Sequence, residues 1–387
     1  MRLAQLLPAP RRPLARLGLA AGLGLAGLLA GAGGSQVTLL AGPAVPGTAQ
    51  PANFPPMVYG LTGNPPDAAT FALGRQLFYD ARLSADGTVS CGSCHRLAAA
   101  FAHAGYRLSP GVGGQLAARN APALQNLRWR RGFMADGGAL GLELQALAPL
   151  TDPREMHQPL AAALIKLNAD ADYRRQFAAI YGPGVIGTAQ FLRALAQFTA
   201  ALTSANSRYD HYVRHEAGGE LTAPELSGLA VFRAKCASCH ATDLFTDERY
   251  RNNGLDHTFP TDSGRARISL KPGDAGRFKV PSLRNVTRTA PYMHDGRFST
   301  LGQVLAHYDH GVRPSRTLDP LLRQPGGQLG IPLSAQEQAD LLTFLNTLTD
   351  NDFLTDRRLL APAPATTHTP PNHLFSVFTL AWFATRN

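Results

Sequence analysis

The sequence predicts a mostly α-helical protein made of two similar domains, and three observations lead to this prediction. A Cys-x-x-Cys-His motif occurs twice, and the first cysteines of the two motifs are 145 positions apart. A similar apolar segment precedes each motif, over residues 73–78 and 226–232. Apolar residues recur at helical spacing over residues 158–178, 188–203 and 334–348. A motif and its flanking helix that both recur indicate two copies of one helical unit.

The last of these segments carries its own start signal. Ser334 and Glu337 form the Ser-x-x-Glu pattern of a capping box, in which each side chain satisfies a free backbone N–H of the first turn. We therefore expect a helix to begin at Ser334 and to continue amphipathically.

The N-terminal residues are typical of an export signal. Arginines without any acidic residue precede an apolar stretch over residues 17–29, and Ala30-Gly31-Ala32 offers a small-residue cleavage site. An uncleaved membrane anchor is the alternative, but the stretch is short for a span of about 20 apolar residues. We expect a signal peptide over residues 1–32 and a periplasmic protein.

Composition places the chain among ordinary globular proteins and excludes one class of partner. The hydrophobic fraction of 44% and the charged fraction of 17% are those of a chain that buries a core. The formal net charge is +10, but no run of Lys and Arg with interleaved aromatic residues occurs. We therefore expect no nucleic acid among the partners.

All four cysteines of the chain belong to the two motifs. Four cysteines of an exported protein could form disulfides, act as redox pairs or bind zinc. None of these uses requires the His that directly follows each second Cys, whereas covalent haem c requires it as the axial iron ligand. The sequence therefore predicts two haem c groups, on Cys91, Cys94 and His95 and on Cys236, Cys239 and His240.

The sixth iron ligands decide what such haems do. A haem with two protein ligands mainly carries electrons, whereas one with an open position can bind and activate a small molecule. Composition alone does not choose among the candidates. They are Met134, Glu155 and Met156 after the first motif, and Met293, His294, His307 and Tyr308 after the second.

Four further segments carry a resemblance to a known family. They are Arg119-Asn120-Ala121-Pro122, residues 143–156 (ELQALAPLTDPREM), residues 244–247 (LFTD) and residues 278–301 (FKVPSLRNVTRTAPYMHDGRFSTL). Over residues 71–348 the chain resembles the bacterial di-haem cytochrome c peroxidases, including their methylamine-utilisation branch, the MauG-like proteins.

The resemblance implies a division of the chain. It implies a mostly α fold of two cytochrome-c-like haem domains packed face to face. We expect a peroxidatic domain at 54–205, an electron-transfer domain at 206–358, and a Pro-rich tail with an apolar end at 359–387.

The resemblance also implies site residues. Gln145, Pro149 and Glu155 match the distal pocket of the N-terminal haem, with Glu155 as the acid–base group. Tyr308 lies fourteen residues after His294 and matches the sixth ligand of the C-terminal haem, where MauG-like members have Tyr and other members commonly have Met.

A calcium ion between the domains is a further implication of the resemblance. Its ligands would include the Asn120 side chain and the backbone carbonyls of Thr289 and Pro291.

The chain departs from the family in two places. Residues 111–114 (GVGG) offer no ligand where many members have a His, so the N-terminal haem should keep an open position. Ala135 stands where members usually have a Trp between the haems, and the sequence does not say whether Trp129 substitutes for it.

These implications predict a di-haem peroxidase or oxidoreductase. It would reduce hydrogen peroxide at the N-terminal haem with electrons passed through the C-terminal haem. The donor would be a small electron-transfer protein, such as a c-type cytochrome or a cupredoxin, or else a protein substrate. The alternatives are a non-catalytic electron-transfer cytochrome and a haem-based sensor.

Overall fold

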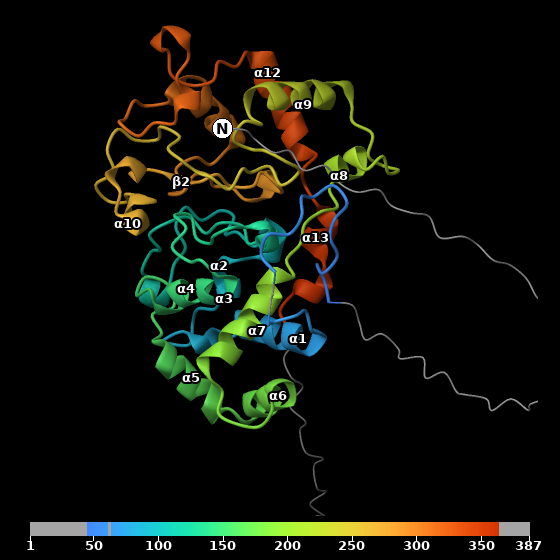
Figure 1. Cartoon of the computed structure of the whole chain (residues 1–387), viewed down its shortest axis with the longest axis vertical. Helices are drawn as coiled ribbons and strands as arrows, with labels where there is room; N and C mark the ends of the chain where they lie inside the picture. Colours follow the sequence, from blue (N-terminus) through green and yellow to red (C-terminus); the bar gives the residue numbers. More distant parts are fainter. Residues whose placement is uncertain (1–44, 61–62, 364–387) are drawn as a thin grey trace, which may run out of the picture. The chain divides into compact units, whose positions relative to one another are not determined.

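The computed structural model describes residues 45–60 and 63–363 (Figure 1). The expected signal peptide and all but the first five residues of the expected tail lie outside the described residues. Within the described part the chain is mostly helical, which confirms the predicted fold class, and the one sheet there has two short strands. No helix in the described part is long and apolar enough to span a membrane.

The N-terminal half, defined here as residues 54–205, contains seven α-helices among its described residues. They are α1 (Ala68–Tyr79), α2 (Cys91–Cys94), α3 (Leu142–Gln145), α4 (Leu147–Thr151), α5 (Leu160–Ala169), α6 (Ala171–Tyr181) and α7 (Thr188–Ala200). The single helical segment predicted over 158–178 is two helices, because Asp170 ends α5 and its carboxylate caps α6 by accepting from the backbone of Asp172 and Tyr173.

The C-terminal half, residues 206–358, follows the same plan with a small sheet added. Its elements are α8 (Arg208–Val213), α9 (Ala223–Lys235), β1 (Tyr250–Arg251), α10 (Ala266–Ser269), β2 (Phe278–Lys279), α11 (Leu301–Ala306), α12 (Ala335–Asn346) and α13 (Asn351–Thr355). β1 and β2 pair antiparallel, with Tyr250 opposite Lys279. The predicted capping box opens α12, where the Ser334 hydroxyl accepts from the Glu337 backbone.

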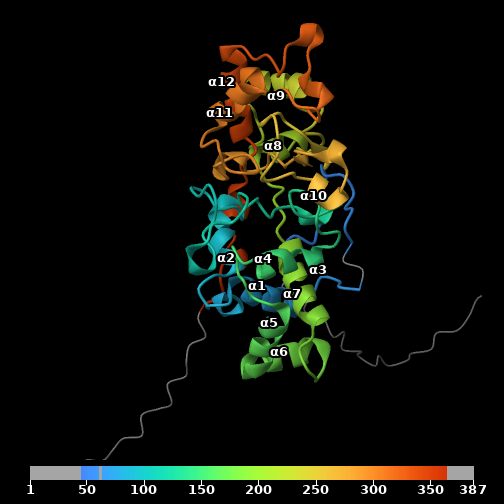
Figure 2. The same ribbon diagram turned by 90° about the vertical axis from the view of Figure 1, so that its left-hand side faces the viewer.

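Each half is organised around one close helix crossing. α1 packs on α7 in the first half and α9 packs on α12 in the second, as Figure 1 and Figure 2 both show. Both crossings depend on a glycine. A Cβ atom at Gly74 would overlap the carbonyl oxygen of Ala194, and one at Gly228 would overlap that of Asp340. The helices can approach this closely only because these positions lack a side chain.

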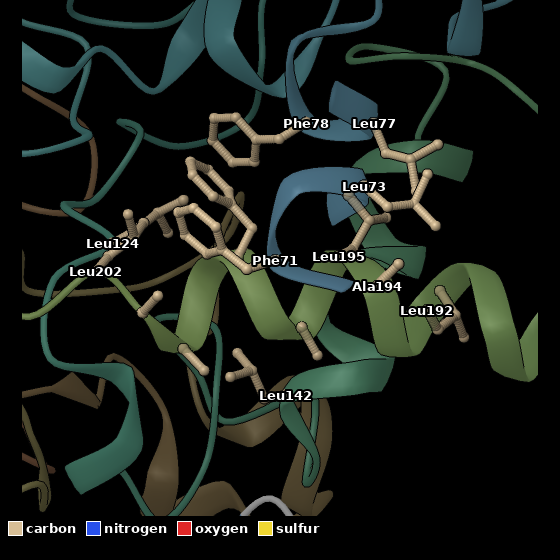
Figure 3. Packing of buried hydrophobic residues seen from close by; sticks show 14 of the residues in the cluster. Phe71, Leu73, Leu77, Phe78, Leu124, Leu142, Leu192, Ala194, Leu195 and Leu202 are labelled. Atoms are coloured by element: carbon tan, nitrogen blue, oxygen red, sulfur yellow. The ribbon is translucent and has the colours of Figure 1, made fainter. Parts of the chain in front are cut away.

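Three aromatic rings fill the first crossing, and three equivalent rings fill the second. Phe78, Phe101 and Phe198 pack with ring centroids 4.9–6.1 Å apart. Figure 3 shows Phe71, Leu73, Leu77 and Phe78 of α1 beside Ala194 and Leu195 of α7. In the second half Phe232, Phe245 and Phe344 pack at 5.2–6.2 Å. Burial of such large rings is the main apolar contribution of each crossing.

The two halves also share a core and a buried polar network. Phe353 and Leu354 of α13 belong to the apolar core of the first half, so the end of the described chain packs back on it. Between the halves, the side chain of Asn285 donates to the Ser204 hydroxyl at 2.9 Å, and its carbonyl oxygen accepts from the Asp350 backbone at 2.7 Å. Gln125 donates to the Arg284 carbonyl in the same network. All these side chains are buried, and such groups are stable there only when they are hydrogen-bonded.

Candidate functional site

The first Cys-x-x-Cys-His motif lies on α2, directly after α1 and its loop. Ser90 precedes the helix, and the His95 ring follows it. His95 Nδ1 lies 2.6 Å from the carbonyl oxygen of Phe101, which can only accept, so Nδ1 carries the proton. The lone pair of Nε2 is therefore free for a metal. Burial lowers the pKa of His95, which favours the neutral ring that a metal needs.

The second motif repeats this geometry at the end of α9. His240 Nδ1 donates to the Phe245 carbonyl at 3.0 Å, and burial again lowers the pKa of this His. Phe101 and Phe245 both have positive φ angles, of 60° and 55°, and this backbone turns each carbonyl toward its histidine. The fixed tautomer is the arrangement that orients a histidine ligand.

The four thiols form no disulfide and are half-buried. Burial raises the pKa of Cys91 to about 12, with the nearby charges of Cys94 and Glu155 adding to it. Burial raises the pKa of Cys236 to about 11. Among the described residues no group of three or more His, Cys, Asp or Glu side chains is placed to hold a metal ion directly. Two thiols with a neutral, oriented His at each site fit thioether-attached haem.

Glu155 lies on the same side of the N-terminal half as the first motif. It lies near enough to Cys91 and Cys94 for its charge to contribute to the raised pKa of both thiols, behind burial as the main cause. Burial also raises the pKa of Glu155 itself, followed by the effect of the Asp152 carboxylate. A half-buried carboxyl group with a raised pKa holds a proton more readily than an exposed one and can pass it on, which suits an acid–base group.

The loop at residues 111–114 fixes the backbone of Glu155. The Val112 N–H donates to the Glu155 carbonyl at 2.8 Å. A Cβ atom at Gly111 would overlap the backbone oxygens of Arg154 and Glu155. The loop that lacks the family's His is therefore packed against the predicted acid–base residue.

Gln145 and Pro149 lie on the two short helices that precede Glu155. Gln145 ends α3, and its amide nitrogen is 3.7 Å from the Met134 sulfur. Pro149 lies in α4, and its carbonyl accepts from the Met156 backbone at 3.2 Å. Met156, a rival sixth ligand, has its side chain buried in the apolar core of this half.

Tyr308 lies in a π-helical segment, His307–Gly311, that continues α11. Such segments are frequent at functional sites. Burial raises the pKa of Tyr308 to about 12, a hydrogen bond with Asn253 opposes this, and the charges of Cys239 and Cys236 add to it. The phenol thus lies close to both thiols of the second motif.

The rival ligands of the second half have other partners. His307 Nε2 donates to the Asn253 carbonyl at 3.0 Å. The ring of His294 stacks on Phe278 with centroids 3.8 Å apart. The Met293 sulfur accepts from the Asn253 side chain at 3.4 Å. Asn253 therefore contacts three of the candidate ligands, and the one local signal for it in the sequence is its place in an Asn-Asn-Gly segment.

An internal repeat relates the distal residues of the two halves. Met134 and Met293 both have positive φ and stand 159 residues apart, as do Asn126 and Asn285. The backbone bridges Phe133–Ala139 and Tyr292–Phe298 have the same spacing. At this spacing Pro149 is the counterpart of Tyr308. A proline ring has no atom that can bind iron, whereas a phenol has one.

The predicted calcium residues belong to two segments that the backbone holds together. The Asn120 N–H donates to the His294 carbonyl at 2.9 Å, and the Gly105 N–H donates to the Ala290 carbonyl at 3.0 Å. The Asn120 amide nitrogen donates to the carbonyls of Tyr106 and Arg107, both at 3.1 Å. This leaves the amide oxygen of Asn120 as the atom suited to a cation.

Two other residues near the sites have contacts that the sequence did not predict. His103 is buried, where its ring contacts Ser109 at 2.7 Å and stacks on Tyr106. Trp129 packs with Phe54 and Leu244, so it contacts the loop after the second motif. The indole N–H of Trp129 donates to the Pro55 carbonyl at 2.8 Å.

Comparison with known proteins places this geometry in one family. Residues 68–218 match the family model for di-haem cytochrome c peroxidase. The chain is 35% identical to the methylamine utilization protein MauG of Methylorubrum extorquens over 74% of this chain and 79% of that protein. It is 34% identical to the cytochrome c peroxidase Ccp of Escherichia coli over 73% of this chain and 59% of that protein.

Solved structures agree with the sequence relatives. A MauG-like protein associated with microbial copper homeostasis superposes with a TM-score of 0.73 at 36% identity, covering 81% of this chain and 98% of that one. The diheme peroxidase BthA from Burkholderia thailandensis superposes with a TM-score of 0.65 at 28% identity, covering 77% of this chain and 91% of that one. The chain therefore belongs to the di-haem cytochrome c peroxidase family, as an oxidoreductase with two haem c groups.

Proposed function

We propose that this enzyme reduces hydrogen peroxide at the haem of its N-terminal half and receives electrons through the haem of its C-terminal half. The observation that carries the proposal is the pairing of Pro149 with Tyr308 at equivalent positions. The first site has no ligand at this position and has Glu155 nearby, whereas the second has a half-buried phenol beside its thiols. One site is thereby suited to bind a small molecule, and the other to carry electrons.

When bound, haem c supplies an iron that can coordinate peroxide and exchange electrons. Glu155 takes a proton from one peroxide oxygen and delivers it to the other, so that the second oxygen leaves as water when the O–O bond breaks. The raised pKa of Glu155 suits it to both steps. Gln145 orients the peroxide by hydrogen bonding, and Pro149 keeps this face free of a protein ligand. Full reduction consumes two electrons and two protons and yields two waters.

In this proposal the phenol oxygen of Tyr308 would hold the iron of the C-terminal haem together with His240. The phenol lies beside Cys236 and Cys239. The ring of His307, the neighbouring candidate ligand, already forms a hydrogen bond from Nε2 to the Asn253 carbonyl. A phenolate ligand favours oxidised iron more than a thioether does. Such a site helps to keep an oxidising equivalent, which agrees with MauG-like rather than Met-ligated chemistry.

The remaining predictions extend the proposal to ions, partners and location. Asn120 with the carbonyls of Thr289 and Pro291 binds one Ca²⁺ between the domains at 54–205 and 206–358. The electron donor is a small c-type cytochrome, a cupredoxin or a residue of a protein substrate. The enzyme works in the periplasm after export by its N-terminal signal. Metal analysis of the purified protein checks the calcium site, and Asn120→Ala should lose the ion.

Low-temperature EPR of the ferric, haem-loaded protein tests the central claim. We expect one high-spin and one low-spin signal, both lost after one equivalent of hydrogen peroxide. Two low-spin signals that peroxide does not change would instead mean that both sixth positions are filled, and an electron-transfer cytochrome would replace the peroxidase. A high-spin signal that shifts on binding without turnover would support a sensor.

Substitutions assign the signals to residues. Tyr308→Phe should convert the low-spin signal to a high-spin one, because the ring then has no oxygen to bind iron. His307→Gln should leave the low-spin signal in place. Loss of the low-spin signal in this variant would identify His307, and not Tyr308, as the ligand. Met156→Leu should leave both signals unchanged, since this side chain packs in the apolar core.

A further inference from the structure

One aromatic side chain of the C-terminal half reaches into a turn of the N-terminal half. Tyr250 starts β1, and its hydroxyl lies against the turn of residues 132–137. A Cβ atom at Gly137 would overlap this hydroxyl, and one at Gly132 would lie 3.4 Å from it. Gly137 has a φ of +73°, so both its backbone and its missing side chain make room for the ring.

The backbone at Tyr250 is linked to the second haem motif by an ion pair and a hydrogen bond. Its neighbour Arg251 forms an ion pair with Asp247 at 2.6 Å, and the Asp247 N–H donates to the Cys239 carbonyl at 2.9 Å. Lys279, opposite Tyr250 in the sheet, donates its N–H to the Ala135 carbonyl at 2.8 Å. The strand pair therefore connects the motif to the turn through short, ordered contacts.

The hydroxyl of Tyr250 contacts a turn of the N-terminal half that lies next to the first haem site. The same turn contains Met134, whose sulfur is 3.7 Å from the amide nitrogen of Gln145. Ala135 of this turn has no aromatic ring, and the ring that packs against the turn is that of Tyr250 from the C-terminal half. Tyr250 thus contacts the turn that carries Met134, while the strand on which it lies is linked to the second motif through Arg251 and Asp247.

Two cations flank the ring and make it hard to oxidise. The Arg265 guanidinium carbon lies 4.6 Å from the ring centroid, and the Lys279 ammonium lies 5.6 Å from it. The charge of Arg265 opposes the loss of an electron from the ring, while the Glu248 carboxylate, 3.2 Å from the Lys279 ammonium, offsets part of the charge of Lys279. Burial also raises the pKa of Tyr250, so the phenol stays protonated. The ring is suited to act as a medium for electron transfer and unsuited to become a radical.

We propose that the ring of Tyr250 is the bridge across which electrons pass between the two haem sites. The inference rests on the proposed function, because it assumes that the C-terminal site supplies the electrons used at the N-terminal one. One electron leaves the reduced C-terminal site and arrives at the oxidised N-terminal site. Tyr250 keeps its own electrons and its proton throughout, and no bond to it forms or breaks.

Photoreduction of the haem-loaded ferric protein with less than one electron per chain tests this bridge. The transient absorbance then follows how fast the electron equilibrates between the two haems, without any peroxide. Tyr250→Leu should slow this equilibration by about tenfold or more, while Tyr250→Phe should restore most of the rate because it keeps the ring. The midpoint potentials and resting EPR signals of both haems should stay unchanged in both variants, which a merely structural role would not predict.

A rival route crosses the same interface and supplies the control. Phe278 of β2 stacks on His294 and lies under the Arg119 guanidinium at 5.3 Å. Phe278→Leu should leave the equilibration rate unchanged. Slowing in Phe278→Leu with a normal rate in Tyr250→Leu would assign the bridge to Phe278 and overturn the inference. Should Tyr250→Leu fail to load both haems, Tyr250→Gln removes the ring with a side chain suited to a half-buried position.

Two further results separate this inference from the proposed function. In one, the wild-type protein fails to turn over peroxide while Tyr250→Leu still slows the electron equilibration between the haems. That pair of results would refute the peroxidase function and support the role of Tyr250 as the bridge. An EPR signal of a tyrosine radical after peroxide that disappears in Tyr250→Phe would show that the ring is oxidised, and would overturn the role of a bridge that keeps its electrons.

Discussion

The two halves of this chain share one scaffold, and each half adds different side chains around its Cys-x-x-Cys-His motif. In each half a glycine lets two helices cross closely, at Gly74 and at Gly228. In each half the carbonyl of a phenylalanine with positive φ holds the proton of the histidine ligand. The chemistry that differs between the halves is therefore added to a common frame, and it depends on a few side chains.

The differences are concentrated on the distal side and in the interface. Pro149 of the first half stands where the second has Tyr308. At the interface Gln125, a neutral amide, stands where the second half has Arg284, which forms a buried ion pair with Asp210 at 2.6 Å. A repeat of backbone geometry thus does not imply a repeat of function, because function follows the few positions at which the copies diverge.

The largest effect is expected at Glu155, which has no counterpart among the proposed ligands of the second half. Glu155→Gln keeps the shape of the side chain but removes its ability to accept a proton. Peroxide turnover should fall by about 10²–10⁴-fold, measured with a reduced cytochrome as donor. Glu220→Gln, an exposed acidic residue, is the control and should leave turnover unchanged. Full turnover in Glu155→Gln would remove this residue from the proposed pocket.

The next effect concerns the charged interface of the second half. The pKa of Asp210 is lowered to about 2: burial opposes ionisation, but hydrogen bonds and the charge of Arg284 outweigh it. Because the folded pKa lies below the unfolded value, the carboxylate stabilises the fold above about pH 4, and this stability is lost as pH falls toward 2. The contribution is about 2–3 kcal/mol.

A double substitution makes this interface resemble the neutral one of the first half. In Asp210→Asn with Arg284→Gln, the free energy of unfolding should depend less on pH between about 4 and 2 than in the wild-type protein. Urea unfolding at several pH values measures this. An unchanged pH dependence would mean that other carboxylates dominate the acid sensitivity of the chain.

The smallest effect concerns the glycines at the two helix crossings, and it should be equal in both halves. It tests whether the two halves share one scaffold. Gly74→Ala and Gly228→Ala each force a methyl group against a backbone carbonyl, which cannot rotate away as a side chain could. Each should lower the free energy of unfolding by about 1–3 kcal/mol. Gly302→Ala in α11 is the matched control, because its nearest neighbour would be the Thr300 hydroxyl at 3.8 Å. A loss in only one half would show that the two crossings are not equivalent.

Much of the site was predictable because its chemistry is local in sequence. The spacing of Cys91, Cys94 and His95 indicates haem attachment on its own, because all three residues lie within one short segment, residues 91–95. The start of α12 was predictable for the same reason, because Ser334 and Glu337 cap one helix turn. The break at Asp170 was missed, although a capping Asp is a local signal, because the apolar periodicity continues across it.

The sequence by itself determined the two haem motifs, the helical class and the family of this protein, because each depends on residues close together in the chain. The contacts of Asn253 and the insertion of Tyr250 at Gly137 were decided by the tertiary structure alone. These features join segments 40 to more than 110 residues apart. No local pattern encodes such contacts, since they form only when the packed helices and the interface bring the segments together.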